Sequence, residues 1–140
     1  MKKIHHYQTS IVWTGNSGTG TDGYTKYDRS YTIQSIHKPI IHGSSDAAFR
    51  GDVTKYNPED LLVASLASCH MLWYLHLCAV AGVIVVAYSD NAVGTMIETD
   101  NGGGRFSEVI LHPTITIKDT SMQEQAILLH NKAHELCFIA

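Results

Sequence analysis

Charged side chains are scarce in this chain, and neither sign dominates. Of 140 residues, ten are Lys or Arg and thirteen are Asp or Glu, which gives a formal net charge of −3. The basic residues are scattered along the sequence and form no run. Recognition of nucleic acid or of an anionic membrane surface uses a basic patch, so the charge pattern predicts neither function.

Cysteine is also rare, and the three that occur are Cys69, Cys78 and Cys137. An odd number argues against a purely structural disulfide framework. The N-terminal residues 1–6 include two lysines, but no apolar run follows them, which is not the pattern of a secretory signal. We therefore expect a cytoplasmic protein whose thiols are reduced at rest.

The longest stretch without charge predicts one long helix. Asn57 is a good N-cap, and Pro58 suits the first helical position, where its missing N–H costs nothing. Gly82 can adopt the left-handed conformation that ends a helix. Residues 61–81, between these signals, contain no Asp, Glu, Lys or Arg and are mostly apolar on every face. We expect a helix that is buried all round.

A membrane span is the alternative interpretation of this stretch, because roughly 17 to 25 apolar residues can cross a bilayer. The segment contains two His and two Ser, however, and no basic cluster flanks it to set an orientation. Strand-like segments on both sides also need an apolar surface to cover. A central helix wrapped by sheet explains both observations.

The segments before the helix predict an antiparallel meander. Apolar and polar residues that alternate between turn-forming residues predict three strands, at residues 5–13, 24–31 and 32–41. Residues 43–56 are polar and irregular, and a loop of this length in a compact domain is often functional.

The segments after the helix predict two more strands and a second helix. Residues 83–99, with a bulge at Asp90-Asn91, and residues 106–118, with a bend at Pro113, flank a hairpin turn at residues 100–104. Ser121 and Glu124 have the spacing of a capping box, which predicts a helix that runs to about Leu136.

The expected order is three strands, a helix, two strands and a helix, which is α+β and not βαβ. The length suits one domain over residues 1–140.

The three cysteines differ in their surroundings. Cys78 lies among apolar residues, so we expect it in the core. Cys69 follows a run of small residues, 64–68, which leaves room for a reachable thiol. Cys137 lies at the end of the second helix, where mobility is plausible. One nucleophilic cysteine and one mobile partner have the composition of a two-cysteine redox site, although core packing remains an alternative for each.

Two segments resemble motifs of the OsmC/Ohr family of organic hydroperoxide reductases. They are Asn57-Pro-Glu-Asp-Leu-Leu-Val-Ala-Ser-Leu-Ala-Ser-Cys69 and Ala133-His-Glu-Leu-Cys-Phe138. The resemblance covers nearly the whole chain and implies an intertwined homodimer with sheets around paired central helices. The family usually continues beyond Ala140 with a short strand, so we expect either that this final strand is missing or that the chain is truncated. The glycine-rich residues 15–20 contain no arginine, which favours the OsmC-like branch over Ohr.

The resemblance implies a role for four residues. Cys69 would be the peroxidatic thiolate, which becomes a sulfenic acid, and Cys137 would condense with it to a disulfide. An external dithiol would reduce the disulfide, and no cofactor is expected. Arg50 would hold the thiolate and polarise the peroxide, and Glu59 would orient Arg50 through charge-assisted hydrogen bonds. The Arg50–Glu59 spacing is one residue from the family's best match. His70 replaces the aromatic residue that usually follows the nucleophile.

Helix geometry separates two of these residues. Glu59 and Cys69 are ten positions apart, which is roughly 15 Å along a helix, and their directions differ by about 80°. Mid-helix burial would also raise the pKa of Cys69, so a cation must come from elsewhere in the fold, and Arg suits because it stays charged when desolvated. We therefore expect Arg50 and Glu59 to serve the site of a second subunit, in an obligate homodimer.

The expected substrate is an organic hydroperoxide with an apolar tail, and the side chains that could line its pocket are Phe49, Met71, Leu72 and Trp73.

Two alternatives remain open. His130, His134 and Cys137 have a spacing that could bind zinc, although no fourth ligand is evident. A family member that has lost peroxidase activity could instead bind an apolar ligand between its helices.

Overall fold

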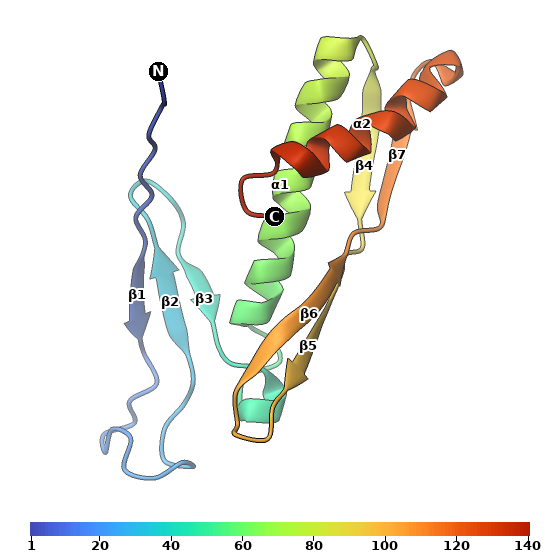
Figure 1. The fold of residues 1–140 in the computed structure, drawn as a ribbon. Helices are drawn as coiled ribbons and strands as arrows, with labels where there is room; N and C mark the ends of the chain where they lie inside the picture. The colour runs from blue at the N-terminus through green and yellow to red at the C-terminus, as the bar shows by residue number, and fades with distance from the viewer. The chain divides into compact units, whose positions relative to one another are not determined.

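The computed structural model describes residues 1–140, which form two compact units, Met1–Leu61 and Leu62–Ala140. Two α-helices and three antiparallel sheets confirm the expected α+β class (Figure 1). The expectation of a single domain stays a prediction.

The first unit contains a three-stranded sheet in the order β1-β2-β3. The strands are β1 (Ser10–Trp13), β2 (Tyr31–Gln34) and β3 (Ile41–Gly43), and both pairs are antiparallel. Gly43 of β3 pairs with Tyr31 of β2, and a Cβ at position 43 would meet the Tyr31 ring, so a side chain there would have to displace it. The expected order of three antiparallel strands is confirmed, but the bounds are not. Residues 32–41, expected as one strand, contain most of β2, a connection over residues 35–40 and the first residue of β3.

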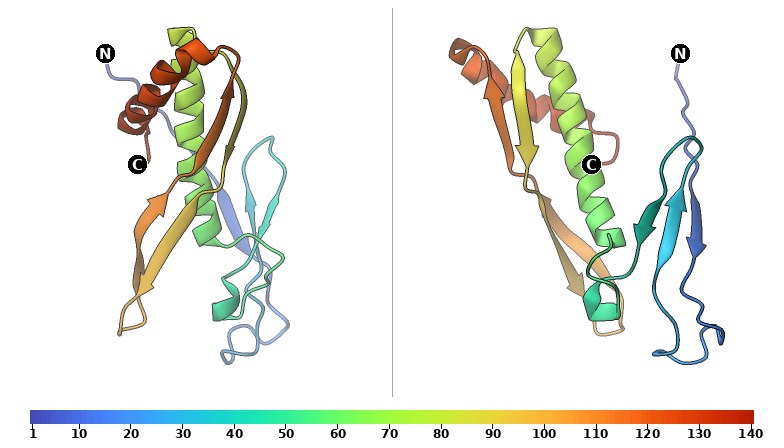
Figure 2. Two further views of the ribbon diagram at one scale, coloured as in Figure 1. Left: turned by 90° about the vertical axis from the view of Figure 1, so that its right-hand side faces the viewer. Right: turned by 180° about the vertical axis from the view of Figure 1, so that it is seen from behind.

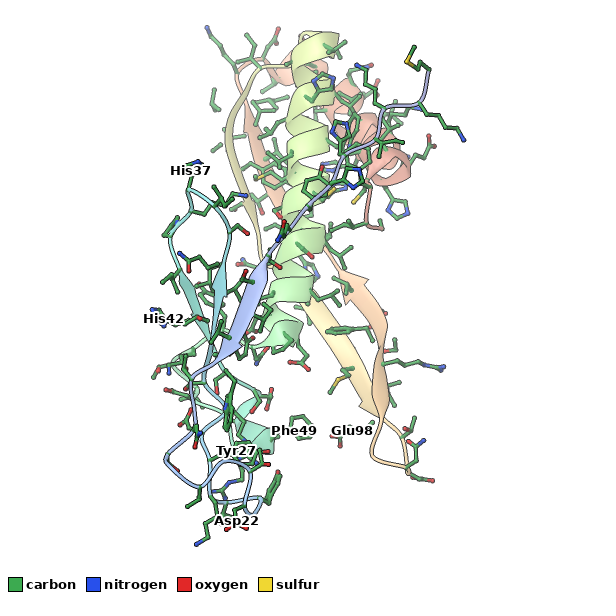
Figure 3. All side chains as sticks on the ribbon, turned by 90° about the vertical axis from the view of Figure 1, so that its left-hand side faces the viewer. Asp22, Tyr27, His37, His42, Phe49 and Glu98 are labelled. Carbon is green, nitrogen blue, oxygen red and sulfur yellow. The ribbon has the colours of Figure 1, made fainter.

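The expected strand over residues 24–31 is wrong, because only Tyr31 belongs to a strand. The guanidinium of Arg29 donates to the backbone oxygens of Tyr24 and Tyr27 and stacks over both rings. Tyr24 and Tyr27 therefore pack around one arginine in turns, and not on the face of a pleated strand. Tyr27 lies in this connection between β1 and β2. His37 lies in the connection between β2 and β3, at the opposite end of the unit (Figure 3).

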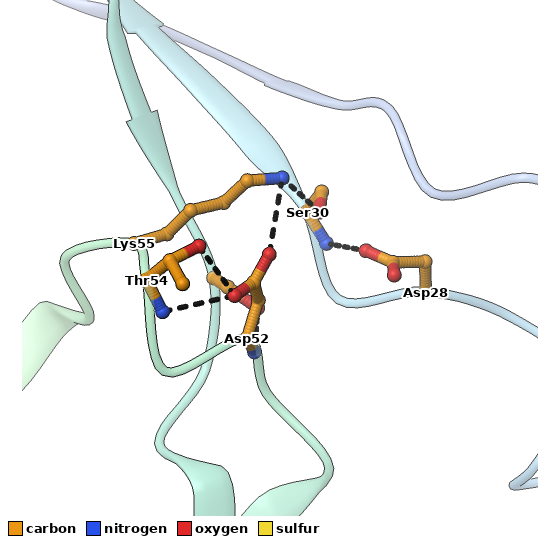
Figure 4. Close-up of polar contacts among 6 residues, drawn as sticks. Asp28, Ser30, Asp52, Thr54 and Lys55 are labelled. Atoms are coloured by element: carbon orange, nitrogen blue, oxygen red, sulfur yellow. Dashed lines mark hydrogen bonds and ion pairs between the residues drawn. The ribbon is translucent and has the colours of Figure 1, made fainter.

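Residues 44–57 connect β3 to the long helix and include a short 3₁₀ turn, η1 (Ala47–Phe49). Lys55 ties this connection to the chain before β2, because its Nζ donates to Ser30 Oγ over 2.8 Å and lies 3.9 Å from Asp52 Oδ2 (Figure 4). Asp52 in turn accepts hydrogen bonds from the backbone N–H and hydroxyl of Thr54. The polar residues of the loop thus stabilise its shape.

The long helix α1 (Pro58–Ala81) has the ends that the sequence predicts. The side-chain oxygen of Asn57 accepts from the backbone N–H of Asp60, and the Asp60 carboxylate accepts from the N–H of Asn57. These reciprocal bonds satisfy two backbone donors at the N-terminus. Gly82 ends the helix with a φ of 78°, a conformation that favours glycine.

The second unit continues with one long hairpin that is interrupted in its middle. Its strands are β4 (Val85–Asp90), β5 (Val93–Glu98), β6 (Gly104–Ile110) and β7 (Pro113–Ile117), with β5 paired to β6 and β4 paired to β7. The predicted turn at residues 100–104 is confirmed. The bulge expected at Asp90-Asn91 and the bend expected at Pro113 coincide with the interruption between the two ladders (Figure 2).

The second helix, α2 (Gln123–Leu136), confirms the expected end at Leu136, but the expected capping box does not form. A 3₁₀ turn, η2 (Thr120–Met122), precedes α2, and the carboxylate of Asp119 accepts from the N–H of Ser121. The stronger acceptor two residues earlier therefore caps the first turn, and Ser121 lies inside that turn instead of before it.

The core of the second unit lies where α1, α2 and the β4–β7 ladder meet. Its buried apolar residues are Tyr74, Cys78, Val83, Ala126 and Ala133. Cys78 is 1% exposed, which confirms its expected place in the core. The small side chains on α2 allow the two helices to approach closely.

The expectation that α1 is buried all round is wrong for a single chain. Only His70, Tyr74 and Cys78 of this helix are buried, at positions one turn apart that define one face. Leu72 and Val80 remain 63% and 74% exposed. The helix α1 is long and apolar enough to cross a membrane. The central helix of a globular protein can have the same length and composition.

Candidate active site

The structure brings together two of the predicted site residues, Cys69 and Cys137. Cys69 lies in the middle of α1, and Cys137 is the residue at which α2 ends and the chain turns to an extended conformation. Both are free, half-buried cysteines, and the Cys137 thiol is hydrogen-bonded to that of Cys69. Residues 68 positions apart in the sequence thus form a pair of thiols in contact.

Burial is the main reason that the pKa of the Cys69 thiol is raised, and the hydrogen bond with Cys137 adds to the effect. The backbone N–H groups of Phe138 and Ile139, which follow Cys137 directly, point at the sulfur and lower its pKa in part. None of these groups carries a positive charge. The second unit therefore positions Cys69 for reaction but holds it mainly as a neutral thiol.

Two pockets are lined by Cys137 or by residues that follow the two cysteines closely in the sequence. The larger, of about 290 Å³, is lined by Leu72, Trp73, His76 and Phe138. Its Trp73 and Phe138 rings meet edge to face, with centroids 5.4 Å apart. Two of the four residues expected to line a substrate pocket, Leu72 and Trp73, are found here, whereas Met71 and Phe49 are not.

The smaller pocket, of about 110 Å³, is lined by one thiol and two imidazoles together with apolar side chains. The complete lining is Leu66, His70, Val109, Leu111, His134, Cys137 and Ala140.

A pair of histidines connects this smaller pocket to the helix interface. His70, which is only 7% exposed, places Nε2 3.0 Å from Nδ1 of His130 on α2. The two rings are nearly coplanar, with an interplanar angle of 4°, and the ring of Tyr74 stacks on His130 with centroids 4.0 Å apart. Burial lowers the pKa of both imidazoles, so the pair is mainly neutral. Since each neutral ring has one donor and one acceptor, one histidine donates to the other.

The zinc alternative is wrong for this arrangement. His130 points to His70, and no group of three His, Cys, Asp or Glu side chains in the chain is placed to hold a metal ion. The sequence spacing of His130, His134 and Cys137 does not become a ligand set, because His130 bonds to His70 while His134 and Cys137 line the smaller pocket.

Arg50 and Glu59, the other two predicted site residues, belong to the first unit. Arg50 ends η1 in the left-handed conformation, with a φ of 64°, and its guanidinium lies 5.9 Å from the centre of the Tyr24 ring. Glu59 lies in the first turn of α1. Burial raises the pKa of Tyr31, and the charge of Glu59 contributes to that shift.

Arg50 and Glu59 form no ion pair within the chain. The two ion pairs that form are Lys55–Asp52 and Lys132–Glu135. The role expected for Glu59 in orienting Arg50 stays a prediction.

Sequence reasoning missed the part that His130 plays. It considered His130 only as a zinc ligand and left open whether His70 shapes the pocket. A signal existed, because a His in the middle of an uncharged helix needs a buried hydrogen-bond partner. The sequence alone does not identify which of the eight other histidines supplies it.

Both the fold and the sequence resemble those of known proteins. The family model described as OsmC-like protein matches residues 50–140. Among solved structures, an OsmC-like protein of unknown function from Vibrio cholerae is 30% identical, with a TM-score of 0.86, over 98% of this chain and 92% of that one. No curated protein matches the sequence.

Two more distant structures show the same fold and are described as organic hydroperoxide resistance proteins. One, from Legionella pneumophila, is 22% identical over 97% of this chain and 88% of its own, with a TM-score of 0.68. The other, from Elizabethkingia anophelis, is 22% identical over 98% of this chain and 86% of its own, with a TM-score of 0.66.

Proposed function

Because this chain belongs to the OsmC-like protein family, we propose that it is a thiol-dependent peroxidase that reduces organic hydroperoxides to alcohols. The observation that carries the proposal is the contact between the Cys69 and Cys137 thiols, which come from different helices. A pair of free thiols near an apolar pocket can give two electrons to a peroxide and become a disulfide.

In the first step the Cys69 thiolate attacks the terminal oxygen of the hydroperoxide. An S–O bond forms, the O–O bond breaks, and the alkoxide takes up a proton to leave as an alcohol. The backbone N–H groups of Phe138 and Ile139 help to stabilise the thiolate. The pocket lined by Leu72, Trp73 and Phe138 would hold the apolar tail of the substrate.

In the second step Cys137 attacks the sulfenic acid on Cys69, which gives a disulfide and water. The existing contact between the two thiols means that the helices need little rearrangement for this step. An external dithiol then reduces the disulfide by thiol exchange, with no cofactor. The reducing conditions that this step requires are consistent with the cytoplasm.

The raised pKa of Cys69 calls for a nearby cation. We propose that Arg50 of a second copy supplies it, oriented by Glu59 of that copy. The exposed apolar residues of α1, such as Leu72 and Val80, are the surface that a homodimer would cover. Burying such side chains in an obligate interface is favourable because each removes apolar area from water.

The test is peroxide consumption with cumene hydroperoxide and dithiothreitol. Cys69→Ser should abolish turnover, whereas Cys137→Ser should still reduce one equivalent of peroxide but recycle poorly. Cys78→Ala is the matched control, since Cys78 lies in the core and should leave turnover intact. Normal turnover by Cys69→Ser would overturn the assignment.

A second candidate is a protein that binds an apolar ligand without catalysis. The raised pKa of Cys69 and the apolar pocket beside it favour this alternative. A wild-type protein that consumes no peroxide but binds a fluorescent fatty acid would support it.

A further inference from the structure

His70 is buried beside the reacting thiols, yet neither step of the proposed reaction uses it. It lies next to Cys69 in the sequence and lines the same 110 Å³ pocket as Cys137. A buried imidazole is costly to retain unless its nitrogens have partners. One nitrogen is satisfied by His130, which lines a separate groove of about 440 Å³ between β7 and α2. The histidine pair therefore extends from the thiol pocket to a second opening of the molecule.

We propose that His70 is the general base that removes the proton of Cys137 when it attacks oxidised Cys69, and that His130 is the positioning residue that holds His70 in the right tautomer. The proposal rests on the proposed peroxidase function. Thiols react as thiolates, so the second step needs a proton acceptor next to Cys137. The shared pocket has room for a bridging water, which allows transfer either directly or through one molecule.

The step balances without any further reactant. His70 takes the proton of Cys137, and the resulting thiolate forms the S–S bond with Cys69 as the S–O bond breaks. The departing hydroxide takes the same proton back from the imidazolium and leaves as water. His130 accepts the hydrogen bond of the charged ring through Nδ1 and so stabilises it over 3.0 Å.

The groups around His70 suit a base that is neutral at rest. Tyr74 of α1 stacks on His130, and His134 of α2 disfavours a second positive charge, whereas Asp90 of β4 stabilises the imidazolium. Burial is the largest influence and lowers the pKa of His70. Tyr88 of β4 stays neutral, because burial raises its pKa to about 12.

The experiment is a single turnover in which sulfenic acid and disulfide are separated by rapid alkylation and mass spectrometry. With cumene hydroperoxide, His70→Phe should form the sulfenic acid at the normal rate but close the disulfide on the order of 100-fold more slowly. In the wild type the closing rate should rise with pH and level off near neutrality. In His70→Phe it should keep rising to alkaline pH, because only hydroxide removes the proton.

His130→Asn, whose amide can replace the Nδ1 hydrogen bond, should keep most of the closing rate, whereas His130→Phe should lose it. His112→Phe, at an exposed position in the β6–β7 connection, is the matched control and should behave as the wild type. An unchanged closing rate and pH profile in folded His70→Phe would overturn the proposal. A larger loss in His134→Phe than in His70→Phe would overturn it as well.

A measurement without peroxide separates this proposal from the peroxidase assignment. In Cys69→Ser, the reaction of Cys137 with methyl methanethiosulfonate near neutral pH should slow when His70→Phe is added. The wild type could consume no peroxide while His70→Phe still slows the reaction of Cys137. In that case the peroxidase assignment fails and the assignment of His70 as the base of Cys137 stands. If His70→Phe does not slow the reaction of Cys137, the assignment of His70 as the base fails, whether or not the wild type consumes peroxide.

Discussion

The hydroxyl of Tyr74, on α1, donates a hydrogen bond of 2.8 Å to the backbone oxygen of Ala126, on α2. Tyr74 is 1% exposed, and its ring also stacks on His130. This one side chain therefore fixes α2 on α1 by both a polar and an aromatic contact, and the position of Cys137 depends on that attachment.

Removing the Tyr74 hydroxyl should weaken the second unit. In Tyr74→Phe the ring stays packed and one buried hydrogen bond is lost, so we expect a loss of about 0.5–1.5 kcal/mol in the free energy of unfolding. Urea denaturation measures it. Tyr7→Phe, at a position 90% exposed, is the control and should change the free energy of unfolding little. Equal stability of the two variants would mean that the bond does not stabilise the fold.

Ala133 should not accept a larger side chain. It is completely buried on α2, where its small size allows close packing on the core. Ala133→Leu should cost about 1–3 kcal/mol through overpacking, and the displaced α2 should close the Cys69–Cys137 disulfide more slowly. Thermal unfolding and the alkylation assay measure the two effects. Leu128→Ala is the control, because Leu128 lies on the same helix and is 62% exposed. Its unfolding temperature and its rate of disulfide closure should stay near those of the wild type.

Mild acid should destabilise the protein through the histidine pair. Burial lowers the pKa of His70 and of His130 below the ordinary value of 6.5. The unfolded chain then binds protons at a higher pH than the folded chain, so the stability from the neutral pair is complete above about pH 6.5 and is lost as the pH falls through the folded values. Urea denaturation at pH 7.5 and at pH 5.5 should show the difference.

His70→Phe should make the free energy of unfolding less dependent on pH between these two values, because one of the two titrating groups is gone. His42→Phe, at an exposed position on β3, should keep the wild-type dependence. A wild-type dependence in His70→Phe would show that other groups cause the acid sensitivity.

The exposed apolar face of α1 predicts the effect of one charge on assembly. Val80 is 74% exposed in the single chain. If a second copy covers α1, Val80→Glu buries a carboxylate in an apolar interface and should weaken the dimer at least tenfold, since burying an unpaired charge is costly. Sedimentation at several concentrations measures the association. Ile4→Glu, 77% exposed in the N-terminal segment, is the control. A wild type that sediments as a monomer would exclude the proposed dimer.

Local chemistry explains which elements could be predicted. Asn57, Pro58 and Gly82 define the ends of α1 through caps that involve only neighbouring residues, and the structure agrees with them. The turn at residues 100–104 is likewise local. The strand expected at residues 24–31 does not form, because Tyr24 and Tyr27 pack around Arg29 in turns. The capping box failed because Asp119 offers a stronger acceptor than Ser121.

By itself, the sequence determined the α+β class, the central helix, the place of Cys78 in the core and the motifs that resemble one family, since these depend on local propensity and on the order of residues. Only the tertiary structure decided that Cys69 meets Cys137 and that His70 meets His130. Both contacts join α1 to α2 across more than half of the second unit's sequence. Their geometry depends on how closely Ala126 and Ala133 let the helices pack, which no local pattern specifies.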